Sequence, residues 1–253
     1  MKVCVLSSGS KGNSTYVEVN NHKILIDIGN SSLYIETALK KIDVDPKDIE
    51  LILITHSHVD HINGLKVFCK KYNPKVYISN IILDELNFSF EKFNILDDLN
   101  SLKEIKIEDF NLSHDVNEVK GYCISDCNSS MVYITDTGYI SEKYFDVLSN
   151  KSLYVFESNH DVSMLMNNEK YPHHTKIRIL SDKGHLSNES SAYYLSKLIG
   201  NNTKHVILAH LSEQNNTEQL AFDTLINTLE KKKKLIPNIV IAKQNVITDL
   251  FDI

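Results

Sequence analysis

The sequence is short of cysteine, of long apolar runs and of positive charge, and each shortage excludes a class of protein. Its 253 residues include four cysteines without any Cys-x-x-Cys spacing, which does not suit a disulfide scaffold and fits a reducing, cytoplasmic location. No run of about 18 apolar residues occurs and the apolar N-terminal stretch is too short for a secretory signal, so we expect no membrane contact. The formal net charge of -6 argues against a polyanionic partner held by bulk electrostatics alone.

Linker-like segments are lacking as well, because no stretch is rich enough in proline, or in glycine and serine, to separate two modules. With 42% hydrophobic and 24% charged residues, the composition is that of a soluble globular protein. We therefore expect residues 1–253 to form a single domain with a core of its own.

Histidine and aspartate, by contrast, crowd into one segment, Thr55-His56-Ser57-His58-Val59-Asp60-His61, directly after the apolar run 51–54. On an extended backbone, residues two apart face the same way, so His56 and His58 can bind one ion together. Asp60 and His61 lie on the next turn and would face a second ion. Imidazole and carboxylate without thiolate suit zinc, manganese or iron. The alternative is a surface loop that happens to be rich in histidine.

Short β-type runs elsewhere in the chain also stop at residues that can bind metal or move protons. The runs 110–112, 131–135, 152–156 and 206–209 end at His114, Asp136, Glu157 and His210. Open sheets commonly place their chemistry where strands end along one edge. We therefore expect these side chains to gather at one rim.

The segments between these points alternate between strand and helix patterns. We expect strands at 2–7, 14–20 and 22–28, a hairpin over 122–135, and helices at 33–42, 63–72, 141–148, 188–199 and 217–231. The loop 7–13 is rich in glycine and serine, which fits a hairpin turn or a loop that lines the site. The stretch before His185 is expected to be loop-rich. Strands and helices in both halves predict a two-sheet α/β sandwich covered by helices.

The motif His56-x-His58-x-Asp60-His61, with Asp27 upstream and His114, Asp136 and His210 downstream, resembles the metallo-β-lactamase superfamily over nearly the whole chain. Four further segments together resemble its YycJ/WalJ/VicX branch: 6–14, Glu157-Ser158-Asn159-His160-Asp161, Gly184-His185-Leu186-Ser187-Asn188 and Ala209-His210-Leu211-Ser212. The resemblance implies the αββα four-layer sandwich. It also implies a metal-dependent exonuclease that acts 5′ to 3′ on duplex DNA.

The same resemblance implies which side chains hold the two divalent ions. The first ion takes His56, His58 and His114, the second takes Asp60, His61 and His210, and Asp136 bridges both. Asp27 supports the site without binding metal. Read alone, the histidines could be ordinary strand-end residues, and Asp27 and Asp136 could be turn formers.

Two close metal ions would lower the pKa of a shared water, and the resulting bridging hydroxide would attack phosphorus in line with the leaving oxygen. The leaving 3′ oxygen then needs a proton. By similarity to tRNase Z-type relatives, His185 is the candidate donor with Glu157 orienting it, and Asp60 is counted with them as catalytic. Alternatively, His185 packs beside a helix start, and Glu157 either contacts a metal ligand from outside or is a solvated acid.

Candidate substrate contacts lie on both sides of His185. Lys176, Arg178 and Lys183 could contact a phosphate backbone, although a solvated surface is the ordinary fate of such residues. Ser187 and Asn188 are good N-cap residues, so the amides of the following helix could receive a phosphate, although an ordinary cap explains them equally well.

Two other functions remain open on the same fold. One is a thioester hydrolase of the glyoxalase II type or another small-molecule metallohydrolase, although only 43 residues follow His210, too few for a glyoxalase-type helical domain. The other is a non-catalytic regulatory protein, which would be expected to lose ligands. DNA as the substrate rests on the branch resemblance, and the sequence leaves the native metal and the oligomeric state open.

Overall fold

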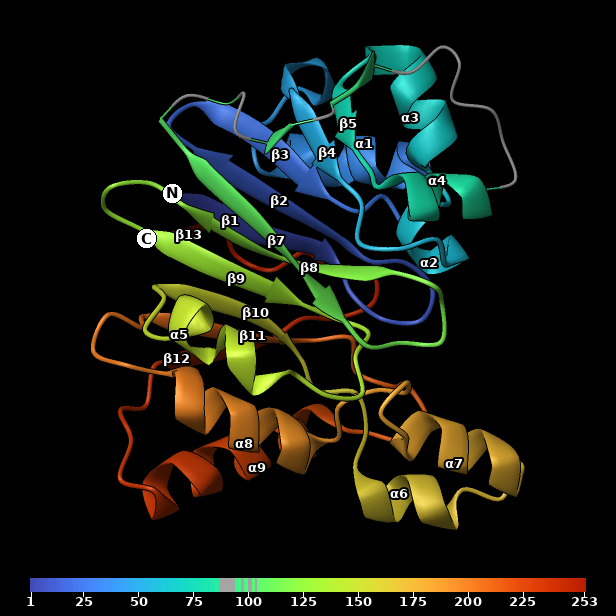
Figure 1. The fold of residues 1–253 in the computed structure, drawn as a ribbon, viewed down its shortest axis with the longest axis vertical. Helices are drawn as coiled ribbons and strands as arrows, with labels where there is room; N and C mark the ends of the chain where they lie inside the picture. Colours follow the sequence, from blue (N-terminus) through green and yellow to red (C-terminus); the bar gives the residue numbers. More distant parts are fainter. Residues whose placement is uncertain (87–93, 97, 100–101, 103) are drawn as a thin grey trace.

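The computed structural model describes residues 1–86, 94–96, 98–99, 102 and 104–253, and its strands form two sheets that face each other (Figure 1). In spatial order, the first sheet contains β13 (Phe251–Asp252), β1 (Lys2–Ser7), β2 (Ser14–Val19), β3 (His22–Ile26), β4 (Leu51–Leu53), β5 (Lys75–Tyr77) and β6 (Asn94–Ile95). Strands β13 to β3 are antiparallel, and β3 to β6 are parallel. The parallel strand β4 is buried throughout, which explains why its sequence is a continuous apolar run.

The second sheet is also mixed. Its spatial order is β12 (Asn238–Ile241), β11 (His205–Ala209), β10 (Leu153–Glu157), β9 (Ser130–Ile134), β8 (Val119–Ser125) and β7 (Lys106–Leu112). Strands β9, β10, β11 and β12 run parallel, so their carboxyl ends meet at the same edge. In this register Glu157 pairs with Ala209, and therefore lies level with the residue before His210.

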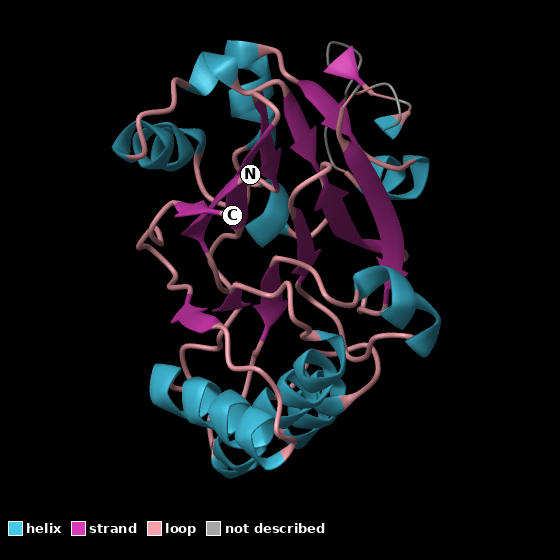
Figure 2. Cartoon of the chain, turned by 90° about the vertical axis from the view of Figure 1, so that its left-hand side faces the viewer, coloured by secondary structure: helices cyan, strands magenta, loops and turns pink. Residues whose placement is uncertain are grey.

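Helices cover the outer face of each sheet, so the molecule has four layers, as the turned view also shows (Figure 2). The first sheet is covered by α1 (Ser32–Lys41) and α3 (Leu65–Tyr72), and the second by α5 (Phe145–Leu148), α8 (Asn188–Leu198) and α9 (Glu218–Lys231). The remaining short helices are η1 (Pro46–Asp48), α2 (Val59–Ile62), α4 (Asn80–Glu85), η3 (Glu142–Tyr144), α6 (Val162–Asn167) and α7 (His173–Leu180). None of the helices within the described ranges is both long and apolar enough to cross a membrane.

Three apolar clusters hold the four layers together. Residues from both sheets, such as Val5 and Leu53 facing Tyr133 and Val155, fill the central cluster. The outer clusters join each sheet to its own helices. Burial of a large apolar side chain stabilises a fold by roughly 1.5–3 kcal/mol, so these clusters fix the strand ends that carry polar residues. The predicted αββα sandwich is confirmed.

One prediction about local structure was wrong. The stretch before His185 is not mainly loop, because Lys176 and Arg178 lie in helix α7. This helix has no buried residue, so its sequence lacks the apolar periodicity by which a helix packed on a core is recognised. The helix expected at 141–148 begins as the 3-10 turn η3 and continues as the single turn of α5.

Candidate metal centre

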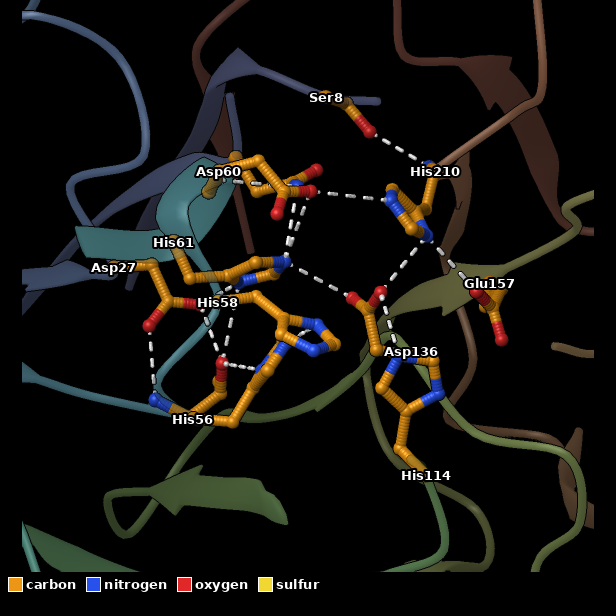
Figure 3. A network of polar contacts seen from close by, with 12 residues as sticks. Ser8, Asp27, His56, His58, Asp60, His61, His114, Asp136, Glu157 and His210 are labelled. Carbon is orange, nitrogen blue, oxygen red and sulfur yellow. Dashed lines mark hydrogen bonds and ion pairs between the residues drawn. The ribbon is translucent and has the colours of Figure 1, made fainter. Parts of the chain in front are cut away.

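The predicted ligands converge where strands of the two sheets end (Figure 3). His56 and His58 follow β4 of the first sheet, and α2 carries Asp60 and His61. The second sheet supplies His114 after β7, Asp136 after β9, Glu157 at the end of β10 and His210 after β11. The rim predicted from the strand ends is therefore shared by the two sheets.

Two of these residues, together with Asp27 after β3, adopt a left-handed backbone conformation directly after a strand or one residue beyond it. The φ angles are 60° at Asp27, 55° at Asp136 and 56° at His210. This conformation costs a residue with a side chain roughly 1–2 kcal/mol, and it persists only where the surrounding structure fixes it. It ends the strand pairing sharply and turns each side chain into the site.

A first group of donors consists of His56, His58 and His114, whose ligand atoms lie within 4.8 Å of one another. Nε2 of His56 is 3.1 Å from Nδ1 of His58. His114 donates from Nδ1 to the carbonyl oxygen of Gly184 at 2.9 Å, which leaves Nε2 facing the group. Burial, followed by the nearby charge of His61, holds the pKa of His56 well below its usual value. The ring is therefore neutral, which is the form that binds metal.

A second group consists of Asp60, His61 and His210. Oδ2 of Asp60 lies 3.7 Å from Nε2 of His61 and 3.8 Å from Nε2 of His210. Burial opposes a charge on His210, but Asp136, Asp60 and Glu157 outweigh it and raise the pKa of His210 to about 10. The pKa of His61 is likewise well above its usual value, because carboxylates led by Asp136 overcome burial. A divalent cation bound here would replace these protons.

Asp136 lies between the two groups. Its Oδ2 is 3.1 Å from Nε2 of His61, and its Oδ1 is 3.3 Å from Nδ1 of His210 and 3.9 Å from Nε2 of His114. Oδ2 of Asp136 and Nε2 of His210 are fully buried yet make no hydrogen bond. Buried polar atoms in proteins are nearly always satisfied, so these two atoms are the ones that a metal ion would engage. The donor set therefore fits divalent metal ions.

Asp27 supports the group from behind. Its carboxylate accepts hydrogen bonds from Nδ1 of His61 at 2.7 Å, from the backbone amide of Thr55 at 2.8 Å and from the hydroxyl of Thr55 at 2.7 Å. The bond to Nδ1 fixes the ring so that Nε2 of His61 points at Asp136. Asp27 thus lies where the predicted supporting role requires, outside the donor groups.

Replacing Asp27 by asparagine is expected to lower metal affinity by about 10–100-fold, because an outer partner of a metal-binding histidine fixes its orientation. The buried donors that face the new amide would also cost about 1–3 kcal/mol in the free energy of unfolding. Asparagine tolerates the left-handed backbone, so the change tests hydrogen bonding. Urea unfolding in the presence of a chelator and a metal titration measure the two effects. Asp146→Asn, an exposed change on α5, is the control, and equal behaviour of the two variants contradicts the supporting role.

Glu157 connects two histidines. Its Oε1 accepts from Nδ1 of His185 at 2.8 Å and from Nδ1 of His210 at 2.9 Å, and its Oε2 accepts from the amides of Thr137 and Leu186, each at 3.0 Å. Burial opposes its charge, but these partners, led by His185, lower the pKa of Glu157 to about 2. Glu157 is therefore ionised and buried rather than a solvated acid. The His185 ring keeps one-fifth of its side-chain surface exposed beside the ligands.

The predicted substrate contacts are dispersed. Arg178 forms an ion pair with Asp115, and Lys183 lines a surface pocket of about 520 Å³ that Asp115 also lines. Lys176 lies further out on α7 and donates to the carbonyl oxygen of Met166 at 2.7 Å. The structure thus brings two of the three cations near the first group of ligands.

The start of α8 is occupied by internal contacts. Ser187 accepts from the amide of Ser190 at 3.1 Å, as an ordinary cap does. Asn188 is 1% exposed, and its side chain bonds to Ser158 and Asn216. These contacts favour a structural role over a phosphate contact at this helix end.

Three residues that contact the proposed ligands were not predicted individually from the sequence. Asn13 donates from Nδ2 to Oδ2 of Asp60 at 3.2 Å. Ser8 accepts from the amide of His210 at 2.7 Å, as Figure 3 shows. Both belong to the loop 7–13, whose position beside the site could be suspected from its glycines and serines. Asp115 lies 3.1 Å from Nε2 of His114, and nothing in its sequence context marked it.

Comparison with known proteins agrees with this arrangement. The sequence model of the Metallo-beta-lactamase superfamily matches residues 8–118. Exodeoxyribonuclease WalJ of Streptococcus pneumoniae serotype 2 is 38% identical over 237 residues, which are 90% of this chain and 88% of WalJ. Exodeoxyribonuclease YycJ of Bacillus anthracis is 40% identical over 240 residues, 90% of this chain and 89% of YycJ. The metallo-beta-lactamase fold protein YhfI of Bacillus subtilis shares the fold, with a TM-score of 0.72, 14% identity and 98% of both chains covered.

Proposed function

The chain belongs to the metallo-β-lactamase superfamily, and within it to the family of the WalJ and YycJ exodeoxyribonucleases, and on that premise we propose that it is a metal-dependent exonuclease acting on DNA. The observation that carries the proposal is identity of 38–40% across nine-tenths of the chain with relatives of that name. The buried, converging donor groups support a hydrolase over a non-catalytic scaffold, because a scaffold has no need to keep them.

Two divalent ions belong to the proposal, and zinc, manganese or iron suits the donors. His56, His58 and His114 would hold the first ion, and Asp60, His61 and His210 the second, with Asp136 shared. When bound, such ions supply a water of lowered pKa and positive charge beside the phosphoryl oxygens. Two separate donor groups on either side of one buried carboxylate support this assignment.

His185 and Glu157 are the proposed proton-transfer pair. The 2.8 Å contact between Nδ1 of His185 and Oε1 of Glu157 keeps one proton on Nδ1 and directs the other nitrogen away from the carboxylate. Nε2 of His185 then donates a proton to the leaving 3′ oxygen. Because Glu157 is held by two backbone amides, the pair does not need to move during the reaction.

DNA would be bound through its phosphates. Arg178 and Lys183 lie beside the first group of proposed ligands, and Lys176 lies on the same helix as Arg178, two residues before it. Such cations position a nucleic acid without reading its sequence. The proposed polarity is 5′ to 3′ on duplex DNA, and the proposed location is the cytoplasm, with which three buried and unpaired cysteines agree: Cys4, Cys69 and Cys123.

A panel of substrates tests the function. Protein reconstituted with Mn²⁺ or Zn²⁺ is expected to shorten 5′-labelled duplex DNA from its 5′ ends and to release mononucleotides or short products at the earliest times. Single-stranded DNA, RNA and a small thioester are expected to react more slowly. Denaturing gels resolve the products, and duplexes with one blocked end give the direction.

Asp60→Ala is the matched control, because it removes a proposed ligand that is partly exposed and leaves the core intact. Its activity is expected to fall to background under the same conditions. Hydrolysis of the thioester alone, with no nucleic acid cleaved by any metal form, would overturn the nuclease proposal in favour of a small-molecule metallohydrolase.

A further inference from the structure

Each histidine of the donor groups presents one ring nitrogen to the site and the other to a partner outside it. His61 contacts Asp27 at 2.7 Å, His210 contacts Glu157 at 2.9 Å, His114 contacts the carbonyl oxygen of Gly184 at 2.9 Å and His56 contacts the hydroxyl of Thr55 at 3.0 Å. Such outer partners select the tautomer that leaves the inner nitrogen unprotonated. His58 needs an outer partner as well, and its side chain is the most exposed of the five, at 36%.

The outer partner of His58 is Asp115. His58 approaches His56 with Nδ1, at 3.1 Å, so its proton must reside on Nε2 if Nδ1 is to bind metal. Oδ1 of Asp115 lies 3.4 Å from that Nε2. The same oxygen is 3.1 Å from Nε2 of His114, the nitrogen that faces the first group, so Asp115 is an outer partner for His58 and lies at the edge of the group for His114.

Arg178 holds Asp115 from the other side. Its guanidinium pairs with Oδ2 of Asp115, the oxygen that does not face the histidines. Arg178 belongs to α7, which has no buried residue. Polar contacts such as this ion pair therefore help to fix the position of the helix. A chain of contacts thus leads from α7 through Asp115 to the first group of ligands.

We propose that Asp115 is a positioning residue for the first metal position, where it fixes the tautomer and orientation of His58 and is itself oriented by Arg178. The inference rests on the proposed metal centre but not on its substrate. It also ties the helix that carries two of the proposed phosphate contacts to the occupancy of the metal site. Asp115 is expected to affect the first metal position more than Arg178 does, because only Asp115 contacts a proposed ligand.

Four variants separate the contribution of Asp115 from that of Arg178. Asp115→Ala removes both the acceptor for His58 and the ion pair, whereas Asp115→Asn keeps an acceptor oxygen and loses only the pair. Arg178→Ala keeps the carboxylate and removes its anchor.

Metal-free proteins are titrated with Zn²⁺ or Mn²⁺ against a chelating indicator. Asp115→Ala is expected to weaken one of two binding equivalents by about 10–100-fold and to leave the other unchanged. The other two variants are expected to lose less than about tenfold, and Arg178→Lys to recover part of that loss.

The tautomer of the His58 ring provides a second measurement. It would not change in the Asp115 variants if Asp115 had a merely structural role. Nitrogen NMR on histidine-labelled protein is expected to show the Nε2–H form of His58 in the parent chain and in Asp115→Asn, and a mixture of tautomers in Asp115→Ala. Asp146→Ala on α5 and Lys176→Ala on α7 are the controls for metal affinity and tautomer, because neither residue belongs to the chain of contacts from Arg178 through Asp115 to His58.

Unchanged metal affinity and an unchanged His58 tautomer in Asp115→Ala would overturn the inference. Equal weakening of both binding equivalents would overturn it too, because that result indicates general loosening of the fold. Neither readout uses DNA, so a parent protein that binds metal but cleaves no nucleic acid would refute the proposed function alone.

Discussion

Replacement of Asp136 by asparagine is expected to lower DNA hydrolysis at least about a thousand-fold and to reduce metal content sharply. The carboxylate is 3.1 Å from His61 and 3.3 Å from His210, and 3.9 Å from His114 on the other side. Removal of its charge therefore acts on both donor groups at once. Asparagine keeps the shape and accepts the left-handed backbone at this position, so the effect isolates the charge.

Elemental analysis after dialysis and initial rates on duplex DNA measure this prediction. Asp146→Asn is the matched control, because it removes one negative charge from an exposed position on α5. Asp60→Ala provides a second comparison, since it is expected to affect mainly the group that contains His61 and His210. Asp136→Asn protein that keeps its metals and more than about a tenth of the parent rate would show that Asp136 is not shared between the groups.

The convergence of the proposed ligands could be predicted from the sequence for two physical reasons. Four of them are adjacent in the chain, where alternation along an extended segment followed by one helical turn fixes how they face. The others, His114, Asp136 and His210, follow β7, β9 and β11. Strands β7 and β9 are both antiparallel to β8, and β9 to β11 are parallel, so the carboxyl ends of these strands lie at one edge. Local pattern and sheet topology therefore explain why His114, Asp136 and His210 lie near His56, whereas their proposed roles as metal ligands come from the resemblance to the metallo-β-lactamase superfamily.

The residues that position the ligands could not be found in this way. Asn13 reaches Asp60 across 47 positions of sequence, and Ser8 reaches His210 across 202. These contacts follow from how the loop 7–13 is folded between the two sheets, which no local periodicity records. The contact between Asp115 and Arg178 depends on helix α7, whose residues were expected to form a loop. A helix without a buried face has no apolar periodicity, so its presence could not be predicted from the sequence.

The site also explains why several of its residues have unfavourable backbone conformations. Asp27, Asp136 and His210 all have positive φ angles, and none of them is a glycine. A strand that continued in its regular conformation would send alternate side chains to opposite faces of the sheet. The left-handed residue ends the strand and directs its own side chain into the site. These backbone conformations lower the free energy of unfolding, and the packing of the sandwich offsets that loss.

Replacement of His185 by alanine is expected to lower the rate on duplex DNA by about 10²–10⁴-fold while metal content stays unchanged. His185 is close enough to Asp136, Glu157 and His210 to form a donor group with them, but its Nδ1 already contacts Oε1 of Glu157 at 2.8 Å and is 3.8 Å from the nearer oxygen of Asp136. Its proposed task is to give a proton to an alkoxide. A leaving group that is stable as an anion does not need that proton, so the rate on a p-nitrophenyl ester of thymidine 5′-phosphate is expected to change less than about tenfold.

The comparison of the two substrates decides between catalysis and structure. A general acid is required only for the poor leaving group, whereas a residue that merely supports the fold or the metals is required equally for both. His174→Ala, an exposed histidine on α7, controls for the loss of an imidazole. Equal losses on DNA and on the activated ester would remove His185 from proton transfer. The 2.8 Å contact with Glu157 would then serve mainly to hold that carboxylate against His210.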